Sequence, residues 1–314
     1  MHRTWLNKVI SYVFLICAPW VIFASEEKSR VIVVADNIFQ YLKDTTKPVE
    51  NEKNIHVLIR AGTTDLALKM LTEGQADIAA ITRSLSQEEK ADHPQWVETP
   101  IASDALVFIV HPDNPLKSLS YSQVQEIYTN PNMTWGDLIG PDHELSHQKI
   151  QPMSKTPENG VFHNFVEYFR ISDYQLKGNS VSFKINSNQE NTARVATVSS
   201  DQAAVAQLAV RKQGIIFVSL TALKSYKNGK DFNVVAFTNV EPSVKTTFDR
   251  SYPITYRLNM VLDSKKSNSE ASEYLAWILE GEGQDIFREF GFAPINLKTK
   301  IIQTTSSITR FRQF

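Results

Sequence analysis

The chain has 314 residues, of which 42% are hydrophobic and 21% are charged. This is the composition of a globular protein, and the length suits one large or two medium domains. With 33 basic and 34 acidic residues the formal net charge is −1, so the overall charge gives no reason to expect a nucleic acid as partner. The single cysteine, Cys17, excludes an intrachain disulfide framework and a multi-cysteine metal site.

The N-terminus has the pattern of an export signal. Arg3 and Lys8 precede an uncharged, mostly apolar run at 9–23, and the small residue Ala24 follows it. A basic start, a short apolar segment and a small residue at the cut are typical of a secretory signal peptide, whereas a membrane-spanning helix needs about 20 apolar residues. We therefore expect residues 1–24 to be a cleaved signal peptide and the mature protein to be periplasmic. An uncleaved anchor is the alternative.

The mature chain reads as alternating strands and helices. Runs of β-branched and apolar residues predict strands at 30–35, 55–60, 77–81, 105–110, 149–153, 215–218 and 255–262. Apolar residues at helical spacing predict helices at 65–73, 86–92, 120–128, 161–170, 200–212, 269–279 and 284–290. Ser86 and Ser120 each open a capping box. This alternation predicts an α/β fold with mixed strands in two sheets.

Short motifs follow one another in a fixed order along the mature chain. They are Gly-Thr-Thr-Asp-Leu at 62–66, Glu-Gly-Gln-Ala-Asp-Ile-Ala at 73–79, Thr-Arg-Ser-Leu-Ser-Gln-Glu-Glu at 82–89, Pro-Ile-Ala-Ser-Asp-Ala-Leu at 100–106, His-Pro-Asp-Asn-Pro at 111–115, Gly-Ile-Ile-Phe-Val at 214–218, Tyr-Pro-Ile at 252–254 and Glu-Gly-Glu-Gly-Gln at 280–284. Together they resemble the phosphate-binding, PstS-like branch of bacterial periplasmic solute-binding proteins. Each motif is unspecific alone, and their order carries the resemblance.

The resemblance implies the type II periplasmic-binding-protein fold, in which two α/β lobes with mixed sheets enclose a cleft. Lobe 1 would comprise 26–108 plus 255–300, lobe 2 would comprise 109–254, and 301–314 would be a C-terminal tail. Closure of the lobes around a solute is the implied motion. The implied function is non-enzymatic: a monomer without cofactor or stable membrane insertion binds a small oxyanion, phosphate or a related one, for sensing or for delivery to an ABC permease.

The physical logic of such a site selects candidate residues. Helix N-termini present unpaired backbone N–H groups, hydroxyls add neutral donors, and arginine adds a bidentate one. Nine residues at strand ends and helix starts form the candidate ligand site: Asp36, Asn37, Thr63, Thr64, Thr82, Arg83, Asn159, Gly160 and Ser200. Simple helix capping explains the threonine pair and Ser200 equally well, and Arg83 could instead form a surface ion pair.

The loop before the predicted helix at 161–170 departs from the family. Where the family has Gly-Ser-Gly-Thr-Arg, residues 158–162 are Glu-Asn-Gly-Val-Phe. Two hydroxyls and a cation are absent, and Glu158 adds a negative charge. Each lost hydrogen bond to a charged ligand weakens binding by roughly 1.5–3 kcal/mol, so this loop predicts weaker phosphate binding than the family pattern would give.

Two other functions compete with solute binding. One is a degenerate homologue that serves as a secreted interaction or sensor module. The other is a zinc hydrolase, because His143, Glu144 and His147 form a His-Glu-x-x-His motif. That motif needs a helix to bring both histidines to one metal, and Pro141 and Pro152 flank a stretch with no apolar helical face. We therefore expect a surface loop there and no metal site.

Overall fold

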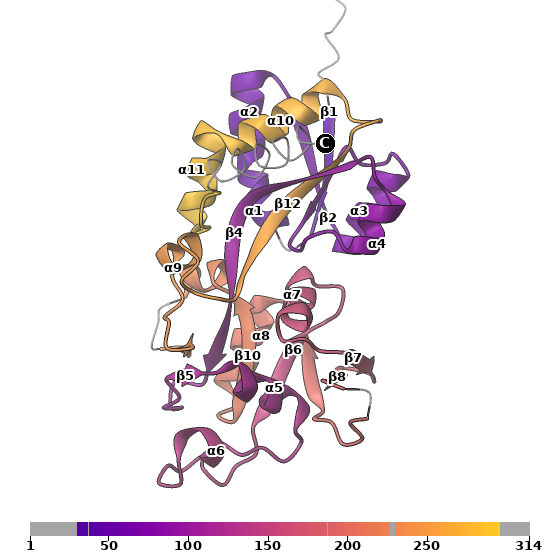
Figure 1. Cartoon of the computed structure of the whole chain (residues 1–314). Helices are drawn as coiled ribbons and strands as arrows, with labels where there is room; N and C mark the ends of the chain where they lie inside the picture. The colour runs from indigo at the N-terminus through magenta and orange to yellow at the C-terminus, as the bar shows by residue number, and fades with distance from the viewer. Residues whose placement is uncertain (1–29, 37, 187, 227–229, 296–314) are drawn as a thin grey trace, which may run out of the picture.

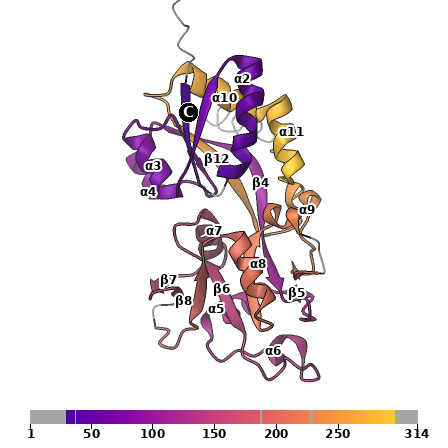
Figure 2. The same cartoon turned by 180° about the vertical axis from the view of Figure 1, so that it is seen from behind.

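The computed structural model describes residues 30–36, 38–186, 188–226 and 230–295. The expected signal peptide at 1–24 and the expected tail at 301–314 lie outside these residues. The described chain forms two α/β lobes that lie end to end. Two long strands, β4 (Trp96–Val110) and β12 (Thr255–Asp263), run between the lobes (Figures 1 and 2).

The first lobe is built on parallel strands. The strand β1 (Arg30–Ala35) lies between β2 (His56–Ala61) and β3 (Ile78–Ile81) and pairs with both in parallel. Four of its six side chains are fully buried, as expected of a strand covered on both faces. The helices of this lobe are α1 (Phe39–Leu42), α2 (Thr46–Lys53), α3 (Thr64–Thr72), α4 (Gln87–Asp92), α10 (Ser269–Leu279) and α11 (Gly281–Phe290).

The second lobe has its own parallel centre. The strand β6 (Gln151–Lys155) pairs in parallel with β10 (Gly214–Ser219) and β9 (Val195–Val198). The other strands are β5 (Ser118–Leu119), β7 (Asp173–Leu176), β8 (Ser180–Lys184) and β11 (Asn233–Phe237). The remaining helices are α5 (Tyr121–Thr129), α6 (Gly136–Ile139), α7 (Gly160–Tyr168), α8 (Asp201–Ala209) and α9 (Val244–Phe248).

The strand β4 joins the sheets of the two lobes. Its residues 96–105 pair antiparallel with β12, and its residues 106–110 pair antiparallel with β10. The hydrogen-bonded path is therefore continuous, in the order β2-β1-β3-β12-β4-β10-β6-β9-β8-β7. The mixed α/β architecture is confirmed, and the two expected sheets are connected through one shared strand.

Most predicted elements are present, with some shifted bounds. The strand at 30–35 and the helix at 269–279 have the predicted limits, and both capping boxes form. The prediction for β4 was too short: the strand begins at Trp96, although Pro100 and several polar residues mask the pattern at 96–104. The predicted helix at 200–212 ends already at Ala209. The sequence pattern does not predict α1, α2, α6, α9, β5, β7, β8, β9 or β11.

An aromatic core fixes the position of α7. Phe165 stacks on Phe217 of β10 with ring centroids 4.3 Å apart, and Phe162 packs against Tyr174 and Phe183. Phe162 and Phe165 are fully buried. Phe162 therefore belongs to the core of the second lobe, and its aromatic contacts hold the helix with its N-terminus toward the first lobe (Figure 1).

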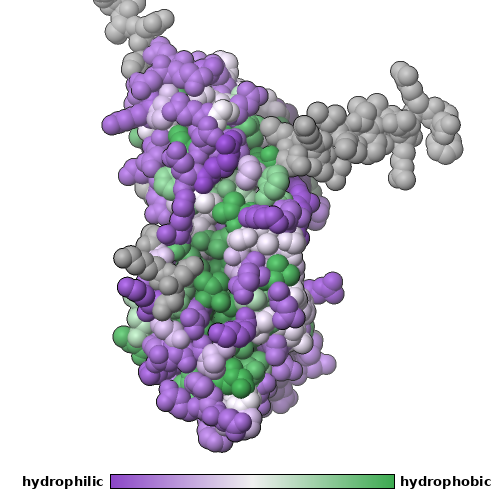
Figure 3. All heavy atoms as spheres, turned by 90° about the vertical axis from the view of Figure 1, so that its left-hand side faces the viewer, coloured by the Kyte–Doolittle hydropathy of each residue, from purple (hydrophilic) through white to green (hydrophobic). Residues whose placement is uncertain are grey.

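The face that carries α9 and α11 is apolar along its middle and polar at its two ends (Figure 3). A pocket of about 500 Å³ near these helices is lined in part by Leu220, Leu223, Val234 and Val244. Among the described residues, none of the helices combines the length and the apolar character needed to cross a bilayer.

Candidate functional site

A buried carboxylate lies where the parallel strands of the first lobe end. Asp36 directly follows β1, Thr82 directly follows β3, and Thr64 is the first residue of α3. Asp36 Oδ2 accepts hydrogen bonds from Thr64 Oγ1 (2.5 Å), the Thr82 backbone N–H (3.0 Å) and Thr82 Oγ1 (3.0 Å). These three groups converge on one oxygen position, and we call them the donor cradle. Carboxyl ends of parallel strands are the usual ligand-binding edge of α/β sheets.

The N-terminus of α7 closes on the donor cradle from the other lobe. A Cβ atom on Gly160 would lie only 2.1 Å from Thr82 Oγ1 and 3.2 Å from Asp36 Oδ2, so only glycine permits this approach. Asn159 caps the helix by accepting from the Val161 N–H at 3.0 Å. One turn later Asn164 Nδ2 donates to the Thr82 carbonyl at 2.7 Å. The two lobes therefore meet directly over the cradle.

The environment of Asp36 is poorly suited to a negative charge. The residue is 5% exposed, and within the described chain its second oxygen, Oδ1, has no hydrogen-bond partner. Desolvation by burial raises the pKa of Asp36, and the hydrogen bonds from Thr64 and Thr82 oppose this shift only in part. A buried polar atom without a partner is uncommon and marks a position that a ligand or water could fill.

The other predicted residues divide by position. Asn159 and Gly160 lie beside the cradle, whereas Asn37 lies outside the described residues. Thr63 caps α3 by accepting from the Leu66 N–H at 3.2 Å. Ser200 caps α8 by accepting from the Ala203 N–H at 3.1 Å. Helix capping therefore accounts for the side chains of both residues, which was the alternative interpretation of each.

Arg83 is engaged away from the cradle. Its guanidinium donates two hydrogen bonds of 2.7 Å to the Glu89 carboxylate and lies 3.6 Å from Asp65. The hydrogen bond to Glu89 is the main cause of the raised pKa of Arg83. In this arrangement the guanidinium fork is already occupied by a carboxylate of its own lobe.

A buried cation that the sequence reading missed lies in the second lobe. Lys155 ends β6 and is only 1% exposed, and its Nζ lies 2.6 Å from Asp201 Oδ1 at the start of α8. No further hydrogen-bond partner of Nζ is found in the described part of the chain. Burial lowers the pKa of the Lys155 ammonium, and the Asp201 carboxylate opposes that shift. The sequence signal was a lysine at the carboxyl end of a strand, five residues before the Gly160 turn.

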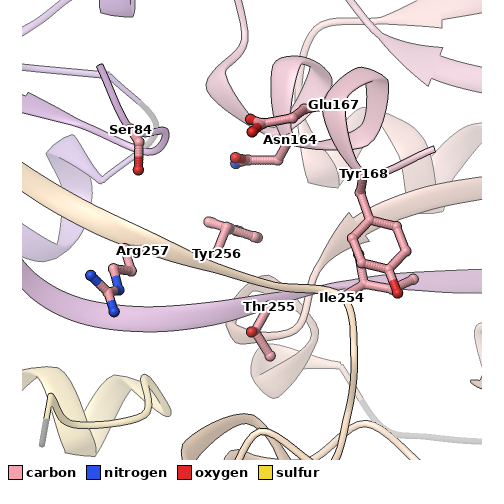
Figure 4. A pocket seen from close by; sticks show the side chains of 8 residues that line it. All are labelled: Ser84, Asn164, Glu167, Tyr168, Ile254, Thr255, Tyr256 and Arg257. Atoms are coloured by element: carbon pink, nitrogen blue, oxygen red, sulfur yellow. The ribbon is translucent and has the colours of Figure 1, made fainter. Parts of the chain in front are cut away.

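A cleft of about 430 Å³ lies between α7 and the crossing strand β12. Figure 4 shows Asn164, Glu167 and Tyr168 coming from α7, with Ser84 on the opposite side. Thr255 and Arg257 line the cleft from β12. Because Asn164 also bonds Thr82, this cleft adjoins the donor cradle.

The His-Glu-x-x-His stretch has no helix. Residues 141–148 form turns and bends, and the His143 Nδ1 atom accepts from the Leu145 N–H at 3.2 Å. Throughout the described ranges, no group of three or more His, Cys, Asp or Glu side chains is placed to hold a metal ion. The stretch is therefore a loop, as its flanking prolines predicted, and it does not place the two histidines one helical turn apart.

The sequence matches the PBP superfamily domain over residues 24–282, which is most of the chain. This chain belongs to the PBP superfamily. Among curated relatives, the phosphate-binding protein PstS of Pseudomonas aeruginosa is 24% identical over 262 residues, which cover 78% of this chain and 76% of the relative.

Solved structures support the same fold for this PBP superfamily member. An ABC-type phosphate transport receptor from Vibrio cholerae superposes with a TM-score of 0.68 at 17% identity, covering 85% of this chain and 100% of that one. A structure from Clostridium perfringens, described as a candidate phosphate ABC transporter substrate-binding protein with bound phosphate, has the same TM-score and coverages at 20% identity.

The crossing strands of this superfamily member hold a second buried acid. Asp104 on β4 accepts from the Ala105 N–H (2.7 Å), from the Thr221 N–H (3.2 Å) and from the Tyr256 hydroxyl of β12 (3.2 Å). Desolvation by burial raises the pKa of Asp104 to about 7, against the effect of these hydrogen bonds. The network ties both crossing strands to the loop after β10, at the point where the lobes are connected.

Proposed function

We propose that this protein is a solute-binding protein of the phosphate-binding type that holds a small oxyanion between its two lobes for uptake or sensing. The observation that carries the proposal is the convergence of Thr64 Oγ1, Thr82 N–H and Thr82 Oγ1 on one oxygen position beneath the N-terminus of α7. Neutral hydroxyl and amide donors at helix and strand ends are suited to an oxyanion.

The altered loop lacks the cation of the family pattern, and the buried cation of the second lobe, Lys155, is already paired with Asp201. Lys155 is a buried ammonium with no hydrogen-bond partner beyond Asp201 among the described residues, and the chain between Lys155 and Gly160 leads into α7. The proposed site therefore relies on the neutral donors of Thr64 and Thr82, where the family's Gly-Ser-Gly-Thr-Arg loop would add a bidentate cation.

The lobe boundaries belong to the same proposal. We place lobe 1 at 26–108 plus 255–300 and lobe 2 at 109–254. The change of β4 from pairing with β12 to pairing with β10 between residues 105 and 106, and the start of β12 at Thr255, support boundaries near these positions. Bending of the crossing strands at this level would open and close the site.

The proposed setting is the periplasm, with an ABC permease as partner and without catalytic activity. The signal-peptide pattern at 1–24 supports export. The printed descriptions of similar structures as an ABC-type phosphate transport receptor and as a candidate substrate-binding protein support the permease. We further propose that the protein acts as a monomer and needs no cofactor, metal or nucleic acid.

Isothermal titration of the mature protein against phosphate, sulfate, molybdate and small carboxylates tests the proposal. We expect at least one oxyanion to bind with a 1:1 stoichiometry and to raise the melting temperature. The absence of heat and of a thermal shift with every anion would reject oxyanion binding.

A further inference from the structure

The donor cradle already contains a carboxylate. All three donors bond to the same atom, Asp36 Oδ2, at distances of 2.5 to 3.0 Å. The Thr64 contact has the length of a charge-assisted hydrogen bond, and the two Thr82 contacts have ordinary hydrogen-bond lengths. The carboxyl group of Asp36 therefore occupies the place that the proposed function gives to an oxygen of the solute.

No cation of the described chain pairs with this carboxylate. Arg83 acts on Asp36 only through longer-range electrostatics, because its guanidinium is bound by Glu89 at 2.7 Å and lies 3.6 Å from Asp65. Lys155 is paired with Asp201 at 2.6 Å. An oxyanion placed against Asp36 would thus meet an acid without an ion-pair partner among the described residues, and the ionised form of that acid would repel it.

The close packing of α7 also keeps the Asp36 carboxyl group in the donor cradle. The backbone of Gly160 lies so close that a Cβ there would be 3.2 Å from Asp36 Oδ2, and Asn164 bonds the Thr82 carbonyl. The lobes therefore close over the cradle with the Asp36 carboxyl inside it. In the described arrangement the three donors of the cradle are satisfied by the protein itself.

From this geometry we propose that Asp36 is a tethered occupant of the donor cradle, which competes with oxyanions for Thr64 and Thr82 and thereby limits their affinity. The proposal rests on the proposed function and adds a specificity-determining residue to it. A tethered competitor has a high effective concentration at its own site, so a free anion must displace it before it can bind.

Titration of sulfate into four proteins at pH 7.5 tests this inference. Sulfate is the probe because its charge is constant between pH 5 and 8. Asp36→Ala empties the cradle, and Asp36→Asn keeps the shape and the hydrogen-bond acceptor while removing the charge. Asp65→Asn is the control, because it removes an exposed acid beside the site that does not touch the cradle. Thermal melts establish that each variant is folded.

We expect Asp36→Ala to bind sulfate at least tenfold more tightly than the wild type. The gain in sulfate affinity should be smaller for Asp36→Asn, and the affinity of Asp65→Asn should stay within about twofold of the wild-type value. If Asp36→Ala does not fold, a gain of threefold or more in Asp36→Asn supports the inference. Unchanged or weaker sulfate binding in the folded Asp36 variants overturns it. Because the wild type is titrated separately with phosphate, a failure of this inference is distinguishable from a failure of the proposed function.

Discussion

The Lys155 ammonium lies 2.6 Å from the Asp201 carboxylate, although the Lys155 side chain is only 1% exposed. Lys155 ends β6 and Asp201 begins α8, so the ion pair connects the carboxyl edge of the second sheet to a helix N-terminus. Removing one partner of a buried pair leaves the other charge uncompensated, whereas removing both does not.

We predict that Asp201→Asn destabilises the protein by roughly 3–5 kcal/mol at pH 7, because the Lys155 ammonium is then buried without a counter-charge. The double variant Lys155→Met/Asp201→Asn is expected to lose clearly less stability than Asp201→Asn, because it buries no unpaired charge. Urea unfolding of the wild type, Lys155→Met, Asp201→Asn and the double variant measures these changes in stability. A double variant whose loss of stability equals the sum of the two single losses would show that the pair is not coupled.

Gly160 is predicted to be essential for contact between the lobes. A methyl group there would lie 2.1 Å from Thr82 Oγ1, so Gly160→Ala forces α7 away from the cradle. Overpacking of this kind costs roughly 1–3 kcal/mol. We expect a lower melting temperature and faster hydrogen exchange around Thr82. Adding Thr82→Ala removes the clashing atom and should recover part of the loss; a purely additive double variant would contradict the contact.

The raised pKa of Asp104 predicts a pH dependence of stability. Between the usual aspartate value, near 4, and about 7, the folded state keeps a proton that the unfolded state has lost. The folded state therefore binds more protons, and stability falls as pH rises through this window, by up to about 1.4 kcal/mol per pH unit. Well above pH 7 the stabilising contribution of protonated Asp104 is fully lost.

The variant Asp104→Asn is expected to flatten this part of the stability curve, since its amide does not titrate. The groups around Asp104 are the Ala105 and Thr221 N–H donors, the Tyr256 hydroxyl and, at longer range, Tyr41. Asp36 contributes a dependence of the same sign, which remains in the variant. Urea unfolding at pH 4.5, 6 and 7.5 provides the test, with the exposed Asp92→Asn as control. Parallel curves for Asp104→Asn and wild type would refute the assignment.

The sequence was a good guide to the fold and to where ligand-binding groups collect. Strand ends and helix starts follow from hydrophobic pattern and capping, and these placed Asp36, Thr64 and Thr82 among the candidates. Which donor meets which acceptor depends on side-chain conformations and tertiary packing. The sequence therefore did not reveal that Asp36 fills the cradle or that Arg83 turns to Glu89.

Two omissions have separate physical causes. The sequence pattern predicts a strand that ends at residue 153, so it leaves Lys155 between that strand and the loop at 158–162, whereas β6 extends to Lys155. The first half of β4 was missed because a crossing strand is not covered evenly on two faces. Its polar residues and Pro100 hide the usual strand pattern.

The most direct test of oxyanion binding in the donor cradle is calorimetric titration of phosphate into the wild type and Thr64→Val/Thr82→Val. The control is Thr72→Val, which removes a hydroxyl from the exposed side of α3. Loss of two hydroxyl donors to an anion corresponds to at least a tenfold weaker affinity. We predict that phosphate binds 1:1 to the wild type and to the control, and that the double variant binds phosphate at least tenfold more weakly. Equal phosphate affinity in all three proteins would contradict the account.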